Sequence, residues 1–243
     1  MSPRQPLISL SVVSHGQSAL VKNLFTDLIN ISPSDFEVIV TINVPEPSDV
    51  FESCPYPTIV IRNETPKGFG ANHNAAFAHA KGKFFAVVNP DIRIESLDLG
   101  RLLGPFEAAG VGLVAPLVVS SHGTVEDSAR RFPTLARLAR RVLLRQKRPD
   151  YRPDNEPIRV DWVAGMFMVF RPEIFSALGG FDAKRFFMYM EDADICRRAR
   201  LRGYEVIVQP VEKVIHDAQR ASQRNFRHMK WHLISVIRYL SGL

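Results

Sequence analysis

The sequence predicts an α/β protein with a single Rossmann-like, mostly parallel sheet flanked by helices. Two observations about the chain favour the α/β class. Apolar runs rich in β-branched residues alternate with helix-like segments through the first half of the chain, as in βαβ units. The chain is also long enough, at 243 residues with 46% hydrophobic content, to bury one sizeable core.

The first half of the chain is the more regular. We expect strands at 7–14, 36–43, 58–62 and 84–89, and helices at 17–30 and 70–80. In the second half we expect strands at 111–119, 160–170 and 205–209, and helices at 135–144, 172–178, 190–202 and 222–240. Gly165 interrupts the strand expected at 160–170.

Polar residues follow the strands of the first half. Their positions are Ser14-His15, Asn43, Asn63 and Asn89-Pro90-Asp91. Parallel sheets bind ligands outside the carboxyl ends of their strands, so these residues are expected at one edge. Asp91 could face a divalent cation and two phosphates, since Mg²⁺ prefers a few carboxylate oxygens completed by phosphate and water. An ordinary Asn-Pro-Asp turn is the alternative, and the residues alone leave it open.

Three carboxylates, Glu191, Asp192 and Asp194, begin a helix whose remainder is basic. The helix dipole explains Asp194 well, because acids stabilise helix N-termini. It does not explain two acids beside a run of aromatic and Met side chains. A partly desolvated carboxylate there would have a raised pKa and would suit a general base.

Two further features, a glycine-containing loop and a histidine, are weaker evidence for a binding site when each is taken alone. Gly68 and Gly70 lie in a loop before a helix, whose backbone amides could bind an anion. An ordinary helix start is as good an explanation, and the third glycine of the dinucleotide fingerprint is missing. His216 follows a strand-like stretch and could ligate a metal, although most lone histidines do not.

Taken together and in this order, these segments resemble the family 2 GT-A glycosyltransferases, in the bacterial rhamnosyltransferase-like branch. The resemblance runs from about residue 7 to 224. It is carried by N-P-D at 89–91, the glycine-rich stretch 68–74, W-x-x-G at 162–165, G-G-F-D at 179–182 and F-F-M-Y-x-E-D-x-D at 186–194. The last of these motifs is the most specific.

The resemblance implies an inverting glycosyltransferase. It would move a sugar, L-rhamnose from dTDP-L-rhamnose, to a hydroxyl of a glycan or lipid-linked saccharide in bacterial cell-surface polysaccharide synthesis. Residues 1–220 would form the GT-A domain, with a nucleotide-sugar half at about 1–95 and an acceptor half at about 96–220. Residues 221–243 would form a basic amphipathic helix.

The resemblance also implies roles for individual residues. Asp192 would be the catalytic base, and Asp91 and His216 would hold Mg²⁺ or Mn²⁺. The donor would contact Ser14, His15, Asn43, Asn63, Gly68, Phe69, Asn72, Asn74, Asn89 and Asp91. The acceptor would contact Trp162, Gly165 and Glu191. One departure is Ile42, where the family typically has an aspartate before the asparagine. The absence of this aspartate puts the preference of the protein for a particular nucleotide in question.

Two basic segments could rest on an anionic membrane surface. One carries Leu135, Leu138 and Val142 among arginines, and the other carries Trp231, Ile234 and Ile237 beside Arg224, Arg227 and Lys230. Both stripes could equally pack on the domain. We expect a cytoplasmic protein that can lie at the inner face of the membrane, because no stretch approaches the roughly 20 apolar residues of a membrane span. Cys54 and Cys196 are expected to be small buried hydrophobic residues.

Two other functions compete. A nucleotidyltransferase also uses a parallel sheet and magnesium, but Ser14-His15-Gly16-Gln17 lacks its G-x-G-x-R loop. A nucleic-acid-binding protein would explain the isoelectric point near 9.5, yet no nucleic-acid module is recognisable, so we expect no such partner. Ile42 also leaves open an inactive transferase.

Overall fold

The computed structural model describes residues 5–31, 35–47, 51, 54–137, 149–216 and 226–242, without the side chains of 226–228. The strands are β1 (Ile8–Ser14), β2 (Phe36–Ile42), β3 (Thr58–Arg62), β4 (Phe84–Val88), β5 (Ile92–Arg93), β6 (Val111–Ser120), β7 (Ala129–Arg130), β8 (Ile158–Val160), β9 (Trp162–Val163), β10 (Phe167–Phe170) and β11 (Glu205–His216). The helices are α1 (Ser18–Leu28), α3 (Phe69–Phe77), α4 (Leu99–Leu103), the 3₁₀ turn η1 (Gly104–Glu107), α6 (Pro172–Ala177), α7 (Glu191–Leu201) and α8 (Phe226–Ser241).

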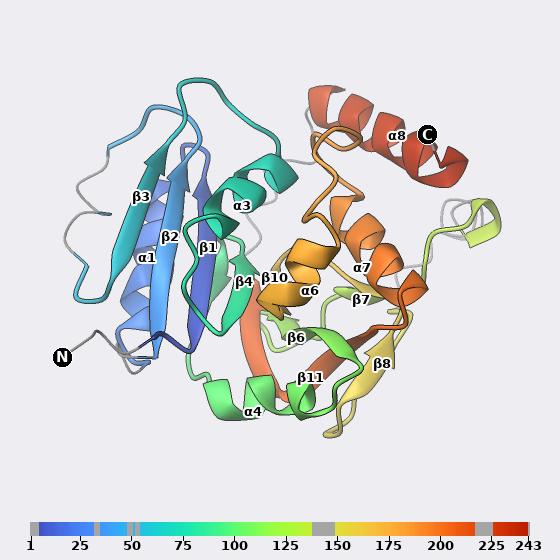
Figure 1. Ribbon diagram of the computed structural model, residues 1–243, viewed down its shortest axis with the longest axis horizontal. Coiled ribbons are helices and arrows are strands. Elements are labelled where there is room, and N and C mark those ends of the chain that lie inside the picture. Colours follow the sequence, from blue (N-terminus) through green and yellow to red (C-terminus); the bar gives the residue numbers. More distant parts are fainter. Residues whose placement is uncertain are drawn as a thin grey trace.

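One nine-stranded sheet organises the molecule (Figure 1), in the order β3-β2-β1-β4-β10-β6-β11-β5 with β8 paired to β11. The β1–β2, β2–β3, β1–β4 and β6–β11 pairs are parallel, and β10 runs antiparallel between β4 and β6. The predicted α/β class and mostly parallel sheet are confirmed. A second, two-stranded sheet pairs β7 with β9.

Two hydrophobic cores cover the two faces of the sheet. One joins α1, through Leu24 and Leu28, to Ile8 and Val12 of β1. The other joins Phe85 and Val87 of β4 to a cluster of phenylalanines that includes Phe170, Phe175 and Phe181. Alternate residues of a strand face opposite sides, so strands that are apolar throughout are buried on both.

The strand expected at 160–170 is wrong as a single element. It is β9 followed by β10, separated by a turn in which the Met166 amide donates to the Ala164 carbonyl at 2.7 Å. A Cβ at Gly165 would lie 2.9 Å from Cζ of Phe69. Glycine at this turn therefore permits the close approach of a neighbouring ring.

The strand expected at 205–209 is longer than predicted. β11 continues to His216 because its pairing with β6 shifts register between Gln209 and Lys213. Such a bulge accommodates Pro210, which cannot donate to the ladder. The continuation pairs His216 with Ile92 of β5 and brings the histidine beside the Asn-Pro-Asp turn.

The remaining expectations concern the two cysteines, the helix at 135–144 and membrane-spanning helices. Cys196 is buried and Cys54 half-buried, and burial raises the pKa of both thiols. Most of the helix expected at 135–144 falls outside the described residues. No helix in the described part of the chain is both long and apolar enough to cross a bilayer.

Candidate active site

The carboxyl ends of β1, β2 and β3 meet at one edge, where asparagines bond to each other. Asn43 Oδ1 accepts hydrogen bonds from Asn63 Nδ2 and the Lys67 amide, each at 2.8 Å. Asn63 Nδ2 also donates to Asn72 Oδ1 at 2.7 Å. The predicted convergence of these residues is therefore confirmed. Their contact with a donor stays a prediction.

Ser14 and His15 belong to the same edge. Ser14 is fully buried, and its Oγ accepts a hydrogen bond from the Gln17 amide at 3.2 Å. His15 is exposed, and its Nδ1 lies 3.0 Å from Asn43 Nδ2. Because an amide nitrogen only donates, this contact favours the imidazole tautomer with its proton on Nε2.

Ile42 lies in the core on the α1 side of the sheet, with 4% of its surface exposed. A carboxylate nevertheless reaches this edge from a position that the sequence did not reveal. Glu46 Oε1 accepts from the Gly16 amide at 3.3 Å. Its Oε2 is buried and has no hydrogen-bond partner among the described residues.

A row of three ionisable side chains lies at the end of β11. Asp91 Oδ2 is 3.2 Å from Nε2 of His216, whose Nδ1 is 2.7 Å from Glu126 Oε2. The hydrogen bond to Asp91 and the charge of both carboxylates raise the pKa of His216 to about 9, against the lowering effect of burial. The pairing of Asp91 with His216 was expected from sequence. Glu126 was missed, because nothing in its local pattern marks it.

The residues at this place fit a divalent cation that is completed by a ligand. Asp91 Oδ1 is buried and lacks a hydrogen-bond partner among the described residues. No group of three or more His, Cys, Asp or Glu side chains in the described part of the chain could hold a metal alone. Mg²⁺ commonly takes only one or two carboxylates together with phosphates and water, so Asp91 with a diphosphate would suffice.

Asp192 is held by two backbone amides at the start of α7. Its Oδ2 accepts from the Gly165 amide at 3.0 Å and its Oδ1 from the Ala193 amide at 2.8 Å. Burial raises the pKa of Asp192, while these hydrogen bonds and the charge of Arg130 oppose the rise. Gly165, expected on the acceptor side, thus positions the carboxylate directly.

Glu191 differs from Asp192 because one of its carboxylate oxygens accepts no hydrogen bond from the described residues. Burial and the charge of Asp192 raise the pKa of Glu191 to about 8. Only 4% of the residue is exposed, and its Oε2 has no hydrogen-bond partner within the described residues. Glu191 therefore holds its proton to a higher pH than an ordinary glutamate, while the amides and Arg130 favour the ionised form of Asp192.

The loop of residues 181–190, called the catalytic loop below, carries backbone strain next to these acids. Tyr189 and Met190 have φ values of 73° and 71°, in the left-handed region that non-glycine residues seldom adopt. Strain of this kind persists only where surrounding contacts enforce it.

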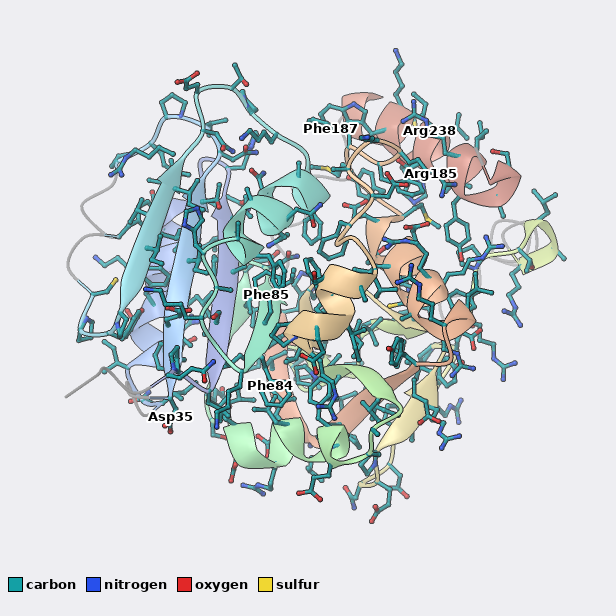
Figure 2. All side chains as sticks on the ribbon, viewed as in Figure 1. Asp35, Phe84, Phe85, Arg185, Phe187 and Arg238 are labelled. Atoms are coloured by element: carbon teal, nitrogen blue, oxygen red, sulfur yellow. The ribbon has the colours of Figure 1, made fainter. Side chains whose placement is uncertain are left out.

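Helix α8 supplies many of those contacts, which sequence reasoning missed. The Ser235 hydroxyl donates to the Met188 carbonyl at 2.8 Å, and the His232 ring lies 5.2 Å from that of Tyr189. The rings of Trp231 and Phe187 are 5.0 Å apart. Figure 2 shows Phe187 and Arg185 beside this helix.

A reciprocal pair of hydrogen bonds completes the attachment of α8. Arg185 Nη2 donates to the Arg238 carbonyl at 2.9 Å, and Arg238 Nη1 donates to the Arg185 carbonyl at 2.6 Å. Arg185 also reaches Asp194, whose second oxygen pairs with Arg198 at 2.7 Å. Asp194 is thus the centre of an ion-pair cluster, beyond the helix-dipole role expected from sequence.

The glycine-rich loop packs against the catalytic loop. A Cβ at Gly68 would overlap the Phe187 carbonyl oxygen, and one at Gly70 would lie 2.6 Å from Cβ of Phe181. The Phe69 amide donates to that Phe187 carbonyl at 3.0 Å. These glycines are explained by close approach of two loops. Anion binding by Gly68 and Phe69 stays a prediction.

Asn74 has a structural role that the sequence did not reveal. Its Nδ2 donates to the Phe181 carbonyl at 2.8 Å, and its Oδ1 accepts from the Phe181 amide at 2.9 Å. Both polar atoms of the side chain thus fix the catalytic loop to α3. Asn74 thus positions this loop, and its contact with a donor stays a prediction.

Trp162 and Asn89 take well-defined places. Trp162 is buried, its Nε1 donates to the Arg131 carbonyl at 3.0 Å, and the Arg130 guanidinium lies 5.3 Å from its ring centre. The Asn89 amide donates to the Met166 carbonyl at 2.9 Å, which continues the β4–β10 pairing. Acceptor contact by Trp162 and donor contact by Asn89 stay predictions.

Comparison with known proteins places this arrangement in a family. The sequence model of "Glycosyl transferase family 2" matches residues 9–175. The chain is 29% identical to rhamnosyltransferase WbbL of Escherichia coli K12, over 97% of this chain and 93% of that protein. It is 31% identical to an N-acetylglucosaminyl-diphospho-decaprenol L-rhamnosyltransferase of Mycobacterium tuberculosis, over 57% of this chain and 48% of that protein.

Solved structures share the fold. GalNAc-T7, solved with UDP, GalNAc and Mn²⁺, superposes with a TM-score of 0.68 at 17% identity, covering 88% of this chain and 44% of that one. The mannosyltransferase PcManGT of Pyrobaculum calidifontis, solved with GDP-Man and Mn²⁺, gives 0.64 at 15% identity, covering 97% and 65%. The fold is therefore GT-A, as expected. The chain belongs to glycosyltransferase family 2 and is a nucleotide-sugar glycosyltransferase similar to bacterial rhamnosyltransferases.

Proposed function

We propose that the protein transfers L-rhamnose from dTDP-L-rhamnose to a hydroxyl of a lipid-linked saccharide or glycan, with inversion at the anomeric carbon, in bacterial cell-surface polysaccharide synthesis. The observation that carries the proposal is the position of Asp192, a half-buried carboxylate fixed by two backbone amides. The likeness to WbbL along nearly the whole of both chains supports rhamnose as the sugar. The mycobacterial relative, named for a diphospho-decaprenol acceptor, supports a lipid-linked one.

Asp192 acts as the general base in this proposal. It takes the proton of the acceptor hydroxyl as the oxygen attacks the anomeric carbon from the face opposite the diphosphate. The Gly165 and Ala193 amides orient the carboxylate and favour its ionised form. No enzyme nucleophile is needed for a single displacement, so one inversion results.

Asp91 and His216 are the residues that would hold Mg²⁺ or Mn²⁺ against the donor diphosphate. The cation supplies neutralisation of the charge that develops on the leaving group. Residues 1–95 would bind the nucleotide sugar and residues 96–220 the acceptor. The family match favours glycosyl transfer over the nucleotidyl-transfer and nucleic-acid-binding alternatives.

The test is a donor screen with purified protein, Mg²⁺ or Mn²⁺, and UDP-, GDP- and dTDP-sugars. Calorimetry measures binding, and release of nucleoside diphosphate measures turnover. We expect dTDP-L-rhamnose to bind, Asp91→Ala to lose metal-dependent binding, and Asp192→Ala to bind the donor while turnover falls at least about a hundredfold. If no nucleotide sugar binds with either metal, or if Asp192→Ala retains turnover, the proposal is wrong.

A further inference from the structure

The outer face of α8 is apolar. Met229, Leu233 and Ile237 are 63%, 59% and 56% exposed, and their spacing of four residues places them on one side of the helix. The other side is buried through Ser235 and Tyr239. The helix is thus attached by one face and presents a hydrophobic stripe on the opposite one.

This stripe differs from the one expected from sequence. Trp231 could from sequence have rested on a membrane or packed on the domain, and its ring packs on Phe187 of the catalytic loop. Ile234 is half-buried, while Ile237 is exposed as expected. In the other basic segment Leu135 is 74% exposed, and the rest of that segment's stripe lies outside the described residues.

Cations lie on α8 and beside it, and no acidic residue of the helix offsets them. The sequence of α8 contains Arg227, Lys230 and Arg238 and no Asp or Glu. Lys230 and Arg238 are exposed. The exposed Arg197 of α7 adds a charge beside the helix, with its guanidinium 5.5 Å from the Tyr239 ring centre.

We propose that this face of α8 docks on an anionic lipid bilayer. Met229, Leu233 and Ile237 enter the boundary between headgroups and acyl chains, and the exposed Lys230 beside them faces lipid phosphates. A second copy of the chain is a poorer occupant, because a two-fold contact would bring like charges together. One narrow stripe also offers less than the roughly 800 Å² per partner of a standard interface.

Docking would place the acceptor side of the site at the membrane. The catalytic loop is bonded to the inner face of α8, so these attachment points lie one helix diameter, about 10 Å, from the proposed lipid surface. Figure 1 shows α8 at the periphery of the molecule, next to α7 and away from α1. The proposal concerns lipid binding alone and does not depend on which sugar is transferred.

The test is co-sedimentation of the full chain with vesicles. Wild type should bind vesicles of equal parts phosphatidylglycerol and phosphatidylcholine, and should bind phosphatidylcholine alone at least about tenfold more weakly. The double variant Leu233→Glu, Ile237→Glu should lose binding to anionic vesicles by at least about tenfold. The matched control is Ile29→Glu, since Ile29 is 52% exposed at the end of α1, and it should bind like wild type.

Several outcomes would overturn the proposal. These are a wild type that binds no vesicles, a double variant that binds normally, and a wild-type dimer that the double variant dissociates in sedimentation velocity. Circular dichroism and the thermal midpoint check that the double variant folds. Asp192→Asn should bind vesicles like wild type, so failure of lipid binding and failure of the proposed reaction can be told apart.

Discussion

Glu191 and Asp192 are adjacent in sequence but differ in the hydrogen bonds that they accept. Asp192 has two backbone amides on its carboxylate, whereas Glu191 has a buried oxygen without a hydrogen-bond partner among the described residues. Burial raises the pKa of both groups and backbone hydrogen bonds oppose the rise in both, but only Asp192 also has a nearby cation, Arg130, that opposes it. The positive charge of Arg130 and the greater exposure of Asp192 thus both favour ionisation of Asp192 over Glu191.

Glu46 offers a test at the scale of one residue. If its buried Oε2 contacts the nucleoside, Glu46→Gln should weaken binding of the nucleoside diphosphate by about tenfold, the effect of losing one charge-assisted hydrogen bond. Calorimetric titration in the presence of Mn²⁺ measures this. Glu107→Gln, at an exposed glutamate of η1, is the control and should leave affinity unchanged. Equal affinities for wild type and Glu46→Gln would contradict the role.

His73 should make stability depend on pH. It is 1% exposed, its Nδ1 lies 2.8 Å from Ser11 Oγ, and burial lowers its pKa to about 3. The unfolded chain takes up this proton below about pH 6.5, whereas the folded protein does so only near pH 3. The stabilisation is complete above pH 6.5, and the free energy of unfolding should fall by about 1 kcal/mol per pH unit between these values.

Chemical denaturation at a series of pH values measures that dependence. His73→Gln can keep a hydrogen bond to Ser11 but has no titrating group, so its unfolding free energy should fall less steeply as the pH is lowered. Comparing slopes removes any constant loss of stability caused by the substitution. The same slope in both proteins would show that His73 does not titrate as described.

At the scale of elements, α8 and α3 both serve the catalytic loop. α3 holds it through Asn74 and the two glycines, and α8 holds it through Ser235 and the reciprocal arginine contacts. Between these attachments lie the left-handed Tyr189 and Met190. The loop is therefore fixed from two sides at the point where its backbone is least relaxed.

Ser235→Ala tests whether this attachment matters for the reaction. Loss of the bond to Met188 should lower the free energy of unfolding by about 1 kcal/mol. We also expect kcat to fall about fivefold through displacement of Asp192, with donor affinity unchanged because Asp91 lies elsewhere. Thr26→Ala is the control, since the Thr26 hydroxyl bonds only within α1, to the Lys22 carbonyl. A variant of Ser235 with lower stability but normal kcat would assign the hydroxyl a purely structural role.

Sequence patterns predicted the helices and strands better than the side-chain contacts between them. Strand ends identified Asn43, Asn63 and Asp91, because parallel strands bring successive carboxyl ends together. Patterns did not reveal Glu126 beside His216 or Ser235 beside Met188, since those pairs are 90 and 47 residues apart and arise only from tertiary packing. The strand at 205–209 was predicted to end before Pro210, because proline usually ends a strand, but a bulge accommodates Pro210 and β11 continues.

At the scale of the whole molecule, one sheet spans both proposed halves of the site. β4, which leads to Asp91, pairs with β10, which follows Gly165, and the Asn89–Met166 hydrogen bond extends that pairing. The cores on the two faces each contain strands from both halves. The donor and acceptor halves therefore share one framework without an intervening linker.

The register between β4 and β10 consequently fixes the distance between Asp91 and Asp192. Asp91 follows β4, and Asp192 bonds to Gly165, which precedes β10. Because Val88 of β4 lies opposite Phe167 of β10, the separation of the two aspartates depends on strand repeats of about 3.4 Å. A slip of one residue would turn every side chain of β10 to the opposite face. Correct alignment of β10 on β4 during folding therefore also sets the spacing between the proposed metal ligand and the proposed base.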